Sequence, residues 1–190
     1  MTPAEYTTLS LADISIGLDD RARDAESTFT PLSVVQLNWR ANADSWSIAQ
    51  CLAHLIVSNE RTRSHAERAL DASQPRTIWQ RLPVLPSLVG PMLVKSQAPG
   101  AGRRMKTSLW AQPTTSDFVA DIVPRYGTHN RELAAWIRGL DAAHASHTTM
   151  ESPFARVLAY SVLDACRLVL SHTDRHLAQA KRVMEAFGAK

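Results

Sequence analysis

Apolar residues recur at intervals of three and four along four segments of the chain, the spacing that places them on one face of an α-helix. No segment alternates apolar and polar residues for long enough to compete with helix. We therefore predict an all-α protein in which four amphipathic helices pack as a bundle. The expected helices cover about Ala4–Phe29, Ile48–Leu70, Phe118–Leu140 and Phe154–Phe187.

Residues that favour helix ends support three of these boundaries. The side chain of either Ser45 or Ser47 can accept a hydrogen bond from the first turn of the second helix. At the fourth helix, Ser152 followed by Pro153 is typical of a helix start, and Gly188 is typical of a helix end.

The connections between the helices differ in character. Residues Phe29–Trp46 mix apolar and turn-forming residues, so we expect an ordered connection with a short helical turn. The long connection between helices 2 and 3 is proline-rich. Six prolines and three glycines in residues 75–113 argue against continuous helix and predict a packed loop with short helical pieces and a mobile tip near Pro99–Arg104. Pro124 is expected to start the third helix late or to kink it.

Length and charge exclude some classes of protein. A chain of 190 residues suffices for one domain with a sizeable core, so we treat residues 1–190 as one domain. The 21 basic residues are scattered among 18 acidic ones, and the densest basic cluster lacks interleaved stacking aromatics. That cluster is Arg103, Arg104 and Lys106. We therefore expect no nucleic-acid partner.

The apolar runs and the cysteines indicate a compartment. The apolar runs are far shorter than the ~20 residues that span a bilayer, and the N-terminal residues include no basic leader. We expect a cytoplasmic protein with no membrane partner. Cys51 and Cys166 lie within amphipathic patterns, so two buried free thiols are expected rather than a disulfide.

Two histidines of the fourth helix, His172 and His176, share the face that carries apolar residues. Side chains four apart have Cβ atoms about 5–6 Å from each other, so both imidazoles can reach one metal ion. The H-E-x-x-H zinc proteases use this spacing, but Thr173 stands where they carry their glutamate base, which disfavours that chemistry. Two histidines alone also fit a core in which each ring makes one hydrogen bond.

A third histidine, His54, lies near the edge of the apolar face of the second helix. Three neutral imidazoles would leave the remaining positions of a divalent ion to water or substrate, as an open catalytic metal site requires. No catalytic residue can be named from the sequence. His129 is the titratable group that we would test as a general base, although a hydrogen-bonded core histidine is the simpler interpretation.

Residues around the histidines have simpler expected roles. We expect Asp174 and Arg175 on the flank or surface of the helix, and Cys51 as a small buried apolar residue rather than a ligand. Three tryptophans are expected to pack in the core or at the ends of the bundle: Trp39, Trp46 and Trp136.

Three stretches stand out together: Asn38–Trp39, WSIAQCLAHLIVSNE at Trp46–Glu60, and SHTDRHLAQAKRVM at Ser171–Met184. They resemble the DinB and YfiT-like superfamily of bacterial four-helix proteins, over about Leu32 to Met184. The resemblance implies an up-down-down-up four-helix bundle. It also implies three metal ligands, one histidine of the second helix and an H-x-x-x-H pair of the last, which here are His54, His172 and His176.

The resemblance further implies a cofactor and a class of reaction. The cofactor would be a divalent metal ion, zinc or nickel, and a set of three imidazole ligands does not distinguish between these two metals. Relatives include transferases that use a low-molecular-weight thiol and metal-dependent hydrolases. Our first hypothesis is therefore a metal-dependent enzyme that acts on a small molecule, as a small-thiol-dependent S-transferase or a related hydrolase. The alternative is a non-catalytic metal-binding or structural stress-response module. A homodimer is also expected from the family.

Overall fold

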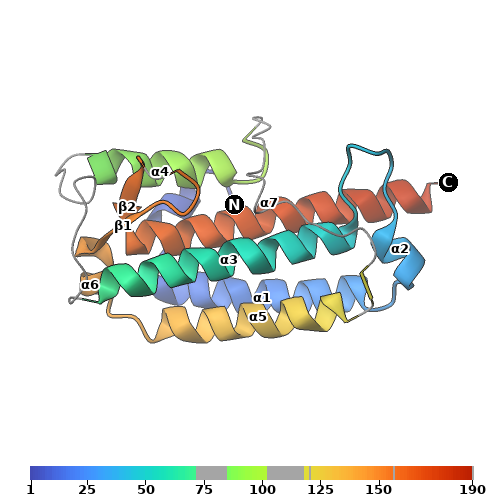
Figure 1. The fold of residues 1–190 in the computed structure, drawn as a ribbon, viewed down its shortest axis with the longest axis horizontal. Coiled ribbons are helices and arrows are strands. Elements are labelled where there is room, and N and C mark those ends of the chain that lie inside the picture. The colour runs from blue at the N-terminus through green and yellow to red at the C-terminus, as the bar shows by residue number, and fades with distance from the viewer. Residues whose placement is uncertain (72–84, 102–117, 120, 156, 190) are drawn as a thin grey trace.

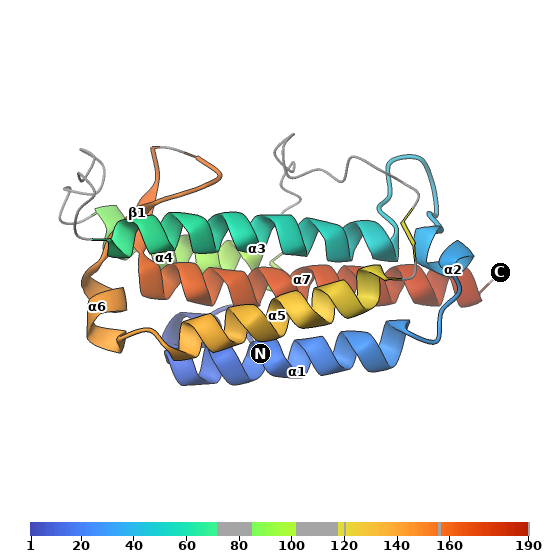
Figure 2. The ribbon, with the colours of Figure 1, turned by 60° about the horizontal axis from the view of Figure 1, so that its bottom comes forward.

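The computed structural model describes residues 1–71, 85–101, 118–119, 121–155 and 157–189. Four long helices lie side by side along the molecule (Figures 1 and 2). They are α1 (Leu11–Phe29), α3 (Ile48–Leu70), α5 (Ile122–Arg138) and α7 (Val162–Gly188). In both views α1 and α7 run in one direction along the bundle, and α3 and α5 run in the opposite direction. The prediction of a mostly helical protein is confirmed.

Shorter elements complete the described part of the chain. They are the 3₁₀ helix η1 (Glu5–Thr8), the helices α2 (Val34–Asn38), α4 (Leu85–Gln97) and α6 (Ala142–His147), and the strands β1 (Thr149–Glu151) and β2 (Ala159–Ser161). The strands pair antiparallel, with Met150 opposite Tyr160. The expectations of a helix from Phe154 and of no strand are therefore wrong. The chain first forms this hairpin, and α7 begins where Ser161 accepts a hydrogen bond from the backbone of Asp164.

Reciprocal side-chain caps explain where the helices begin. Ser47 accepts a hydrogen bond from the backbone N–H of Gln50, whose side chain accepts one from the backbone N–H of Ser47. Of the two serines suggested by the sequence, Ser47 is thus the cap of α3. Ser10 and Asp13 make the same arrangement, so α1 starts after Ser10 and not near Ala4. Such caps satisfy N–H groups that have no partner within the helix.

Helix α4 corrects the prediction that residues 75–113 hold no continuous helix. It spans 13 residues with Pro91 inside, although a proline removes one hydrogen bond of a helix. Packing against α7 offsets that loss (Figure 1). At Gly90 the approach is so close that a Cβ atom would lie 2.3 Å from Oδ2 of Asp164. Residues 75–84 and 102–113 lie outside the described residues, with much of the expected tip.

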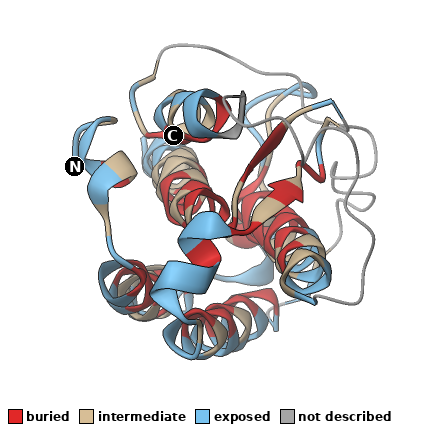
Figure 3. Ribbon diagram, turned by 90° about the vertical axis from the view of Figure 1, so that its left-hand side faces the viewer, coloured by how far each residue is buried: buried red, intermediate tan, exposed pale blue. Residues whose placement is uncertain are grey.

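The buried residues lie on the inward sides of the long helices, as the end-on view in Figure 3 shows. The apolar ones form two clusters. The first cluster includes Leu18, Leu133 and Leu170, and the second includes Leu55, Tyr126 and Leu177. Some buried polar residues, such as Asn59 in α3 and Thr173 in α7, fall between residues of the two clusters along their helices. Within the described ranges, no helix has both the length and the apolar character needed to cross a bilayer.

Candidate metal centre

Three histidines from two helices come together beside the core. His54 lies in the second turn of α3, and His172 and His176 are one turn apart in α7. Each offers a ring nitrogen within 4.8 Å of those of the other two. The Nε2 atoms of His54 and His172 are 3.3 Å apart, and the ring centroids of His172 and His176 are 4.6 Å apart. The structure thus brings together all three predicted ligands.

This spacing fits a shared metal ion. Zinc–imidazole bonds are about 2.0–2.1 Å long, so two nitrogen ligands of a tetrahedral zinc lie about 3.3 Å apart. The Nε2 atoms of His54 and His172 have this separation. The Nδ1 atom of His176 is buried without a hydrogen-bond partner among the described residues, which coordination or a bound water would relieve. The cluster could hold a metal ion, but its three imidazoles do not identify which one.

Burial keeps two of the rings neutral. It is the main reason why the pKa of His172 lies well below its usual range, and repulsion by His176, His54 and Arg175 adds to the effect. Burial also lowers the pKa of His176 to about 3, with His54 and Arg175 adding repulsion and Gln179 opposing them. Both rings are therefore uncharged near pH 7, and neutral imidazole is the form that binds a metal.

Trp46 lies against the histidines, although the sequence suggested only a packing role for it. Its ring stacks on His176 with centroids 5.6 Å apart and an interplanar angle of 20°, and its centroid is 4.9 Å from that of His54. Because Trp46 directly precedes the cap Ser47, the turn that starts α3 also places the indole. His172 remains partly exposed.

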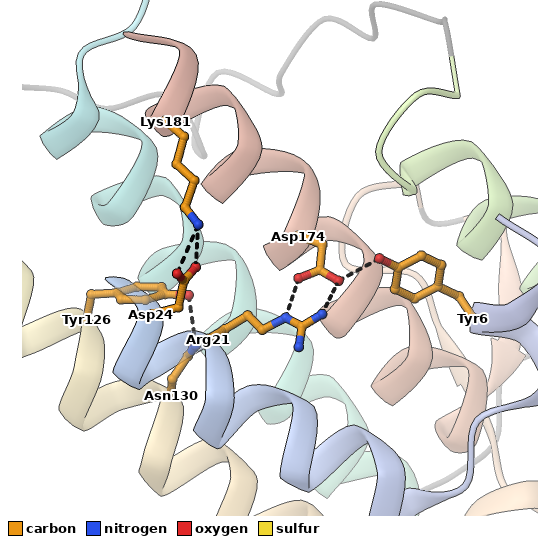
Figure 4. Close-up of polar contacts among 7 residues, drawn as sticks. All are labelled: Tyr6, Arg21, Asp24, Tyr126, Asn130, Asp174 and Lys181. Carbon is orange, nitrogen blue, oxygen red and sulfur yellow. Dashed lines mark hydrogen bonds and ion pairs between the residues drawn. The ribbon is translucent and has the colours of Figure 1, made fainter. Parts of the chain in front are cut away.

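Asp174 lies about 200° around α7 from His172, so it faces away from the cluster. Figure 4 shows its carboxylate between Arg21 and Tyr6. Arg21 donates through Nε at 2.6 Å and through Nη2 at 2.9 Å, and the Tyr6 hydroxyl donates at 2.5 Å. The side chain of Asp174 is only 11% exposed, so of the two expected positions it lies on the flank of α7, against α1, and not at the surface. These charge-assisted bonds offset the cost of burying the carboxylate.

Arg175 and Cys51, two other residues near the histidines, contribute to the fold. Nη1 of Arg175 donates to the carbonyl oxygen of Ser96 at 3.0 Å, which ties α7 to the end of α4. Cys51 lies fully buried in the second apolar cluster. Burial raises the pKa of its thiol to about 12, so the ligand-competent thiolate is disfavoured. Cys51 is thus a buried free thiol, as predicted.

His129 is not part of the cluster. It lines an open pocket of about 350 Å³ between α3 and α5, with Ile56, Arg125 and Glu132 among its neighbours. Burial lowers the pKa of His129, and the charges that act on it come from Glu60, Glu132 and Arg63, not from the three histidines. The hypothesis that His129 is a general base therefore gains no support from the structure.

Comparison with known proteins gives one result. Residues 18–180 match the family model of the DinB superfamily, a range that includes all three histidines of the cluster. Neither the comparison with curated proteins nor the one with solved structures found a match.

Proposed function

The chain belongs to the DinB superfamily, and from this membership and the three converging histidines we propose that it is a metal-dependent enzyme. The observation that carries the proposal is the 3.3 Å separation between the Nε2 atoms of His54 and His172. The unpartnered Nδ1 of His176 also supports the proposal. Folded proteins rarely leave a buried ring nitrogen unpaired. Within the described residues Nδ1 of His176 is unpaired, as is Nε2 of His129, but only His176 lies beside two other imidazoles.

The proposed ligands of the ion, zinc or nickel, are His54, His172 and His176. Three imidazoles leave one position of a four-coordinate ion for a small molecule. When bound, such an ion would lower the pKa of a thiol or a water molecule and so supply a nucleophile at neutral pH. The partly exposed side of His172 is the proposed direction of approach, because Trp46 stacks on His176.

In the proposed reaction a low-molecular-weight thiol gives up its proton to solvent, its sulfur forms a bond to an electrophilic carbon, and the bond from that carbon to its leaving group breaks with the electron pair. Hydrolysis, in which water takes the place of the thiol, is the related possibility. Thiolate sulfur is a soft ligand that suits zinc. A thiol whose pKa is lowered by the ion needs no histidine or carboxylate base beside it. The position of His129 in a separate pocket is compatible with such a mechanism.

Elemental analysis of protein purified without an affinity tag tests the proposal, together with turnover assays on panels of thiols with electrophiles and of hydrolase substrates. We expect near-stoichiometric zinc or nickel in the parent protein, and loss of both metal and turnover in His172→Ala. His144→Ala is the matched control, because His144 is an exposed histidine of α6. It should keep both properties.

Two outcomes would contradict the enzyme proposal. Metal without turnover on any panel would favour the non-catalytic metal-binding module. Folded parent protein that binds neither zinc nor nickel when these are supplied would exclude both proposals and leave the histidines a packing role.

A further inference from the structure

Three buried polar atoms from three helices have no hydrogen-bond partner among the described residues. They are Nδ2 of Asn59 in α3, Oδ1 of Asn130 in α5 and Oγ1 of Thr173 in α7. None of these three residues is more than 1% exposed. Folded proteins rarely leave buried polar groups unsatisfied. The three atoms therefore need a partner that the described residues do not supply.

The three residues occupy the same layer of the bundle. Each lies on the inward face of its helix, one turn from a residue of the second apolar cluster: Leu55, Tyr126 and Leu177. In the other direction along each helix, the inward face continues with residues of the first cluster: Ala66, Leu133 and Val169. Asn59, Asn130 and Thr173 thus form a polar layer between two apolar ones.

Helix α1 contributes a small residue to this layer. Ala22 is fully buried but belongs to neither apolar cluster, and it lies between Leu18 of the first and Ala25 of the second. A methyl group fills little of the space between four helices. An internal water needs polar partners and space, and the small side chain of Ala22 favours the second of these conditions.

We propose that this layer binds an internal water molecule that joins α3, α5 and α7. The water accepts a hydrogen bond from Nδ2 of Asn59, donates one to Oδ1 of Asn130, and bonds to Oγ1 of Thr173 in either sense. Three partners are typical of a buried water. The amide of Asn130 is oriented for this role because its Nδ2 donates to the Tyr126 hydroxyl at 2.8 Å (Figure 4).

The water site lies next to the histidine cluster, and it does not depend on the identity of any metal or reaction. Thr173 adjoins His172 in α7. Asn59 adjoins Ser58, whose hydroxyl oxygen is 3.4 Å from the ring nitrogens of His54. By joining α3 to α7 at this level, the water helps to hold the two helices in the register that brings His54 to His172.

Thr173→Val tests this site, with Thr62→Val as the matched control. Thr62 is also a buried threonine, but its hydroxyl donates to the carbonyl oxygen of Ser58 at 2.9 Å and so needs no water. A high-resolution crystal structure of the parent should contain a water within hydrogen-bond distance of all three atoms. The water should persist in Thr62→Val and be lost or displaced in Thr173→Val. The melting temperature of Thr173→Val should lie at least about 2 °C below that of Thr62→Val.

Three results would overturn the proposal. One is a direct Asn59–Asn130 hydrogen bond with no water between the two side chains. Another is a peak with the short contacts of a metal ion at this position. The third is Thr173→Val melting at or above Thr62→Val, because in a dry layer a methyl group in place of an unpaired hydroxyl is neutral or stabilising.

Discussion

The same turn of α7 carries two polar clusters on opposite sides, and they differ in how completely their groups are paired. On one side, Asp174 accepts three hydrogen bonds from Arg21 and Tyr6. On the other side, His172 and His176 face α3, and one buried nitrogen of His176 has no partner within the described residues. Burial of polar groups alone therefore does not mark a functional site. The histidine cluster stands out because its side chains are potential metal ligands and the described residues leave one of their buried nitrogens unpaired.

The two clusters also differ in what they do for the fold. The Asp174 carboxylate is neutralised by Arg21, so the cluster links α7 to α1 and, through Tyr6, to η1. The histidines are kept neutral by burial, and their mutual repulsion on protonation adds nothing to stability near pH 7. We therefore expect changes in the first cluster to lower stability and changes in the second to lower metal affinity.

The largest expected effect is that of Asp174→Ala on stability. The change leaves the guanidinium of Arg21, which is 27% exposed, and the buried hydroxyl of Tyr6 without this partner. Removing one member of a largely buried ion pair should cost about 3 kcal/mol of unfolding free energy. Denaturant unfolding of the metal-free protein measures the cost. Folded Asp174→Ala should still bind metal, and a cost under about 0.5 kcal/mol, the size of an ordinary surface change, would refute a stabilising role.

His172→Ala is expected to lower metal affinity rather than the stability of the metal-free protein. The free energy of zinc binding to structural sites with four ligands is about 10–16 kcal/mol, or about 3 kcal/mol for each ligand. Loss of one ligand should therefore weaken metal binding roughly 100-fold. Competition with a chromophoric chelator measures this loss, and the stability of the metal-free protein should stay near that of the parent. The exposed His144→Ala serves as the control. Equal affinity in the two variants would remove His172 from the site.

The sequence predicted the histidine cluster but not the Asp174 cluster. The reason is that local spacing relates only residues that are close together in the chain. His172 and His176 share a face of one helix by local spacing, and the family resemblance pointed to His54. Tyr6 and Asp174 lie 168 positions apart, and no local pattern links them. Only the packing of η1 and α1 against α7 brings these residues together.

Other differences from the predicted fold have local causes. The Ser152–Pro153 signal extended the fourth helix back to Phe154, but Phe154 and Val157 are 38% and 55% exposed, so neither contributes to a buried helical face. The position of Trp46 did have a sequence signal. A hydrophobic residue directly before an N-cap commonly packs back on the helix, and Trp46 precedes Ser47. Applied to the sequence, this rule would have placed the indole beside the start of α3.

Tyr6→Phe sharpens the comparison with a smaller change. It removes the hydrogen bond from Tyr6 to Asp174 and leaves the Arg21–Asp174 pair in place. The expected loss is about 1 kcal/mol of unfolding free energy, measured by denaturant titration. In an Asp174→Ala background the same substitution should have little effect, since the two changes remove one shared interaction. Additive losses would show that the Tyr6 hydroxyl acts through another group.

The smallest expected effect concerns the ion pair of Glu26 and Arg131, an exposed counterpart of the Asp174 cluster. The pair joins α1 to α5 with an Oε1–Nη2 distance of 2.8 Å, and its side chains are 30% and 46% exposed. The hydrogen bond from Arg131 lowers the pKa of Glu26 from its usual 4.5, and burial opposes the shift. A carboxyl with a lowered folded-state pKa stabilises the protein above its unfolded-state pKa, and this contribution is lost as the pH falls through the folded-state value.

Glu26→Gln separates the charge of this pair from its shape. The amide keeps the contact with α5, where the Glu26 carboxylate lies against Gly127. We expect the variant to be less stable than the parent by under about 1 kcal/mol at neutral pH, and the difference to vanish at an acidic pH below the lowered folded-state pKa, where Glu26 is protonated in both states. Unfolding titrations at the two pH values measure it. A difference that persists at low pH would assign the effect to shape. A loss as large as that of Asp174→Ala would mean that pairing stabilises exposed and buried carboxylates alike, and burial would no longer explain why Asp174 is expected to contribute more than Glu26.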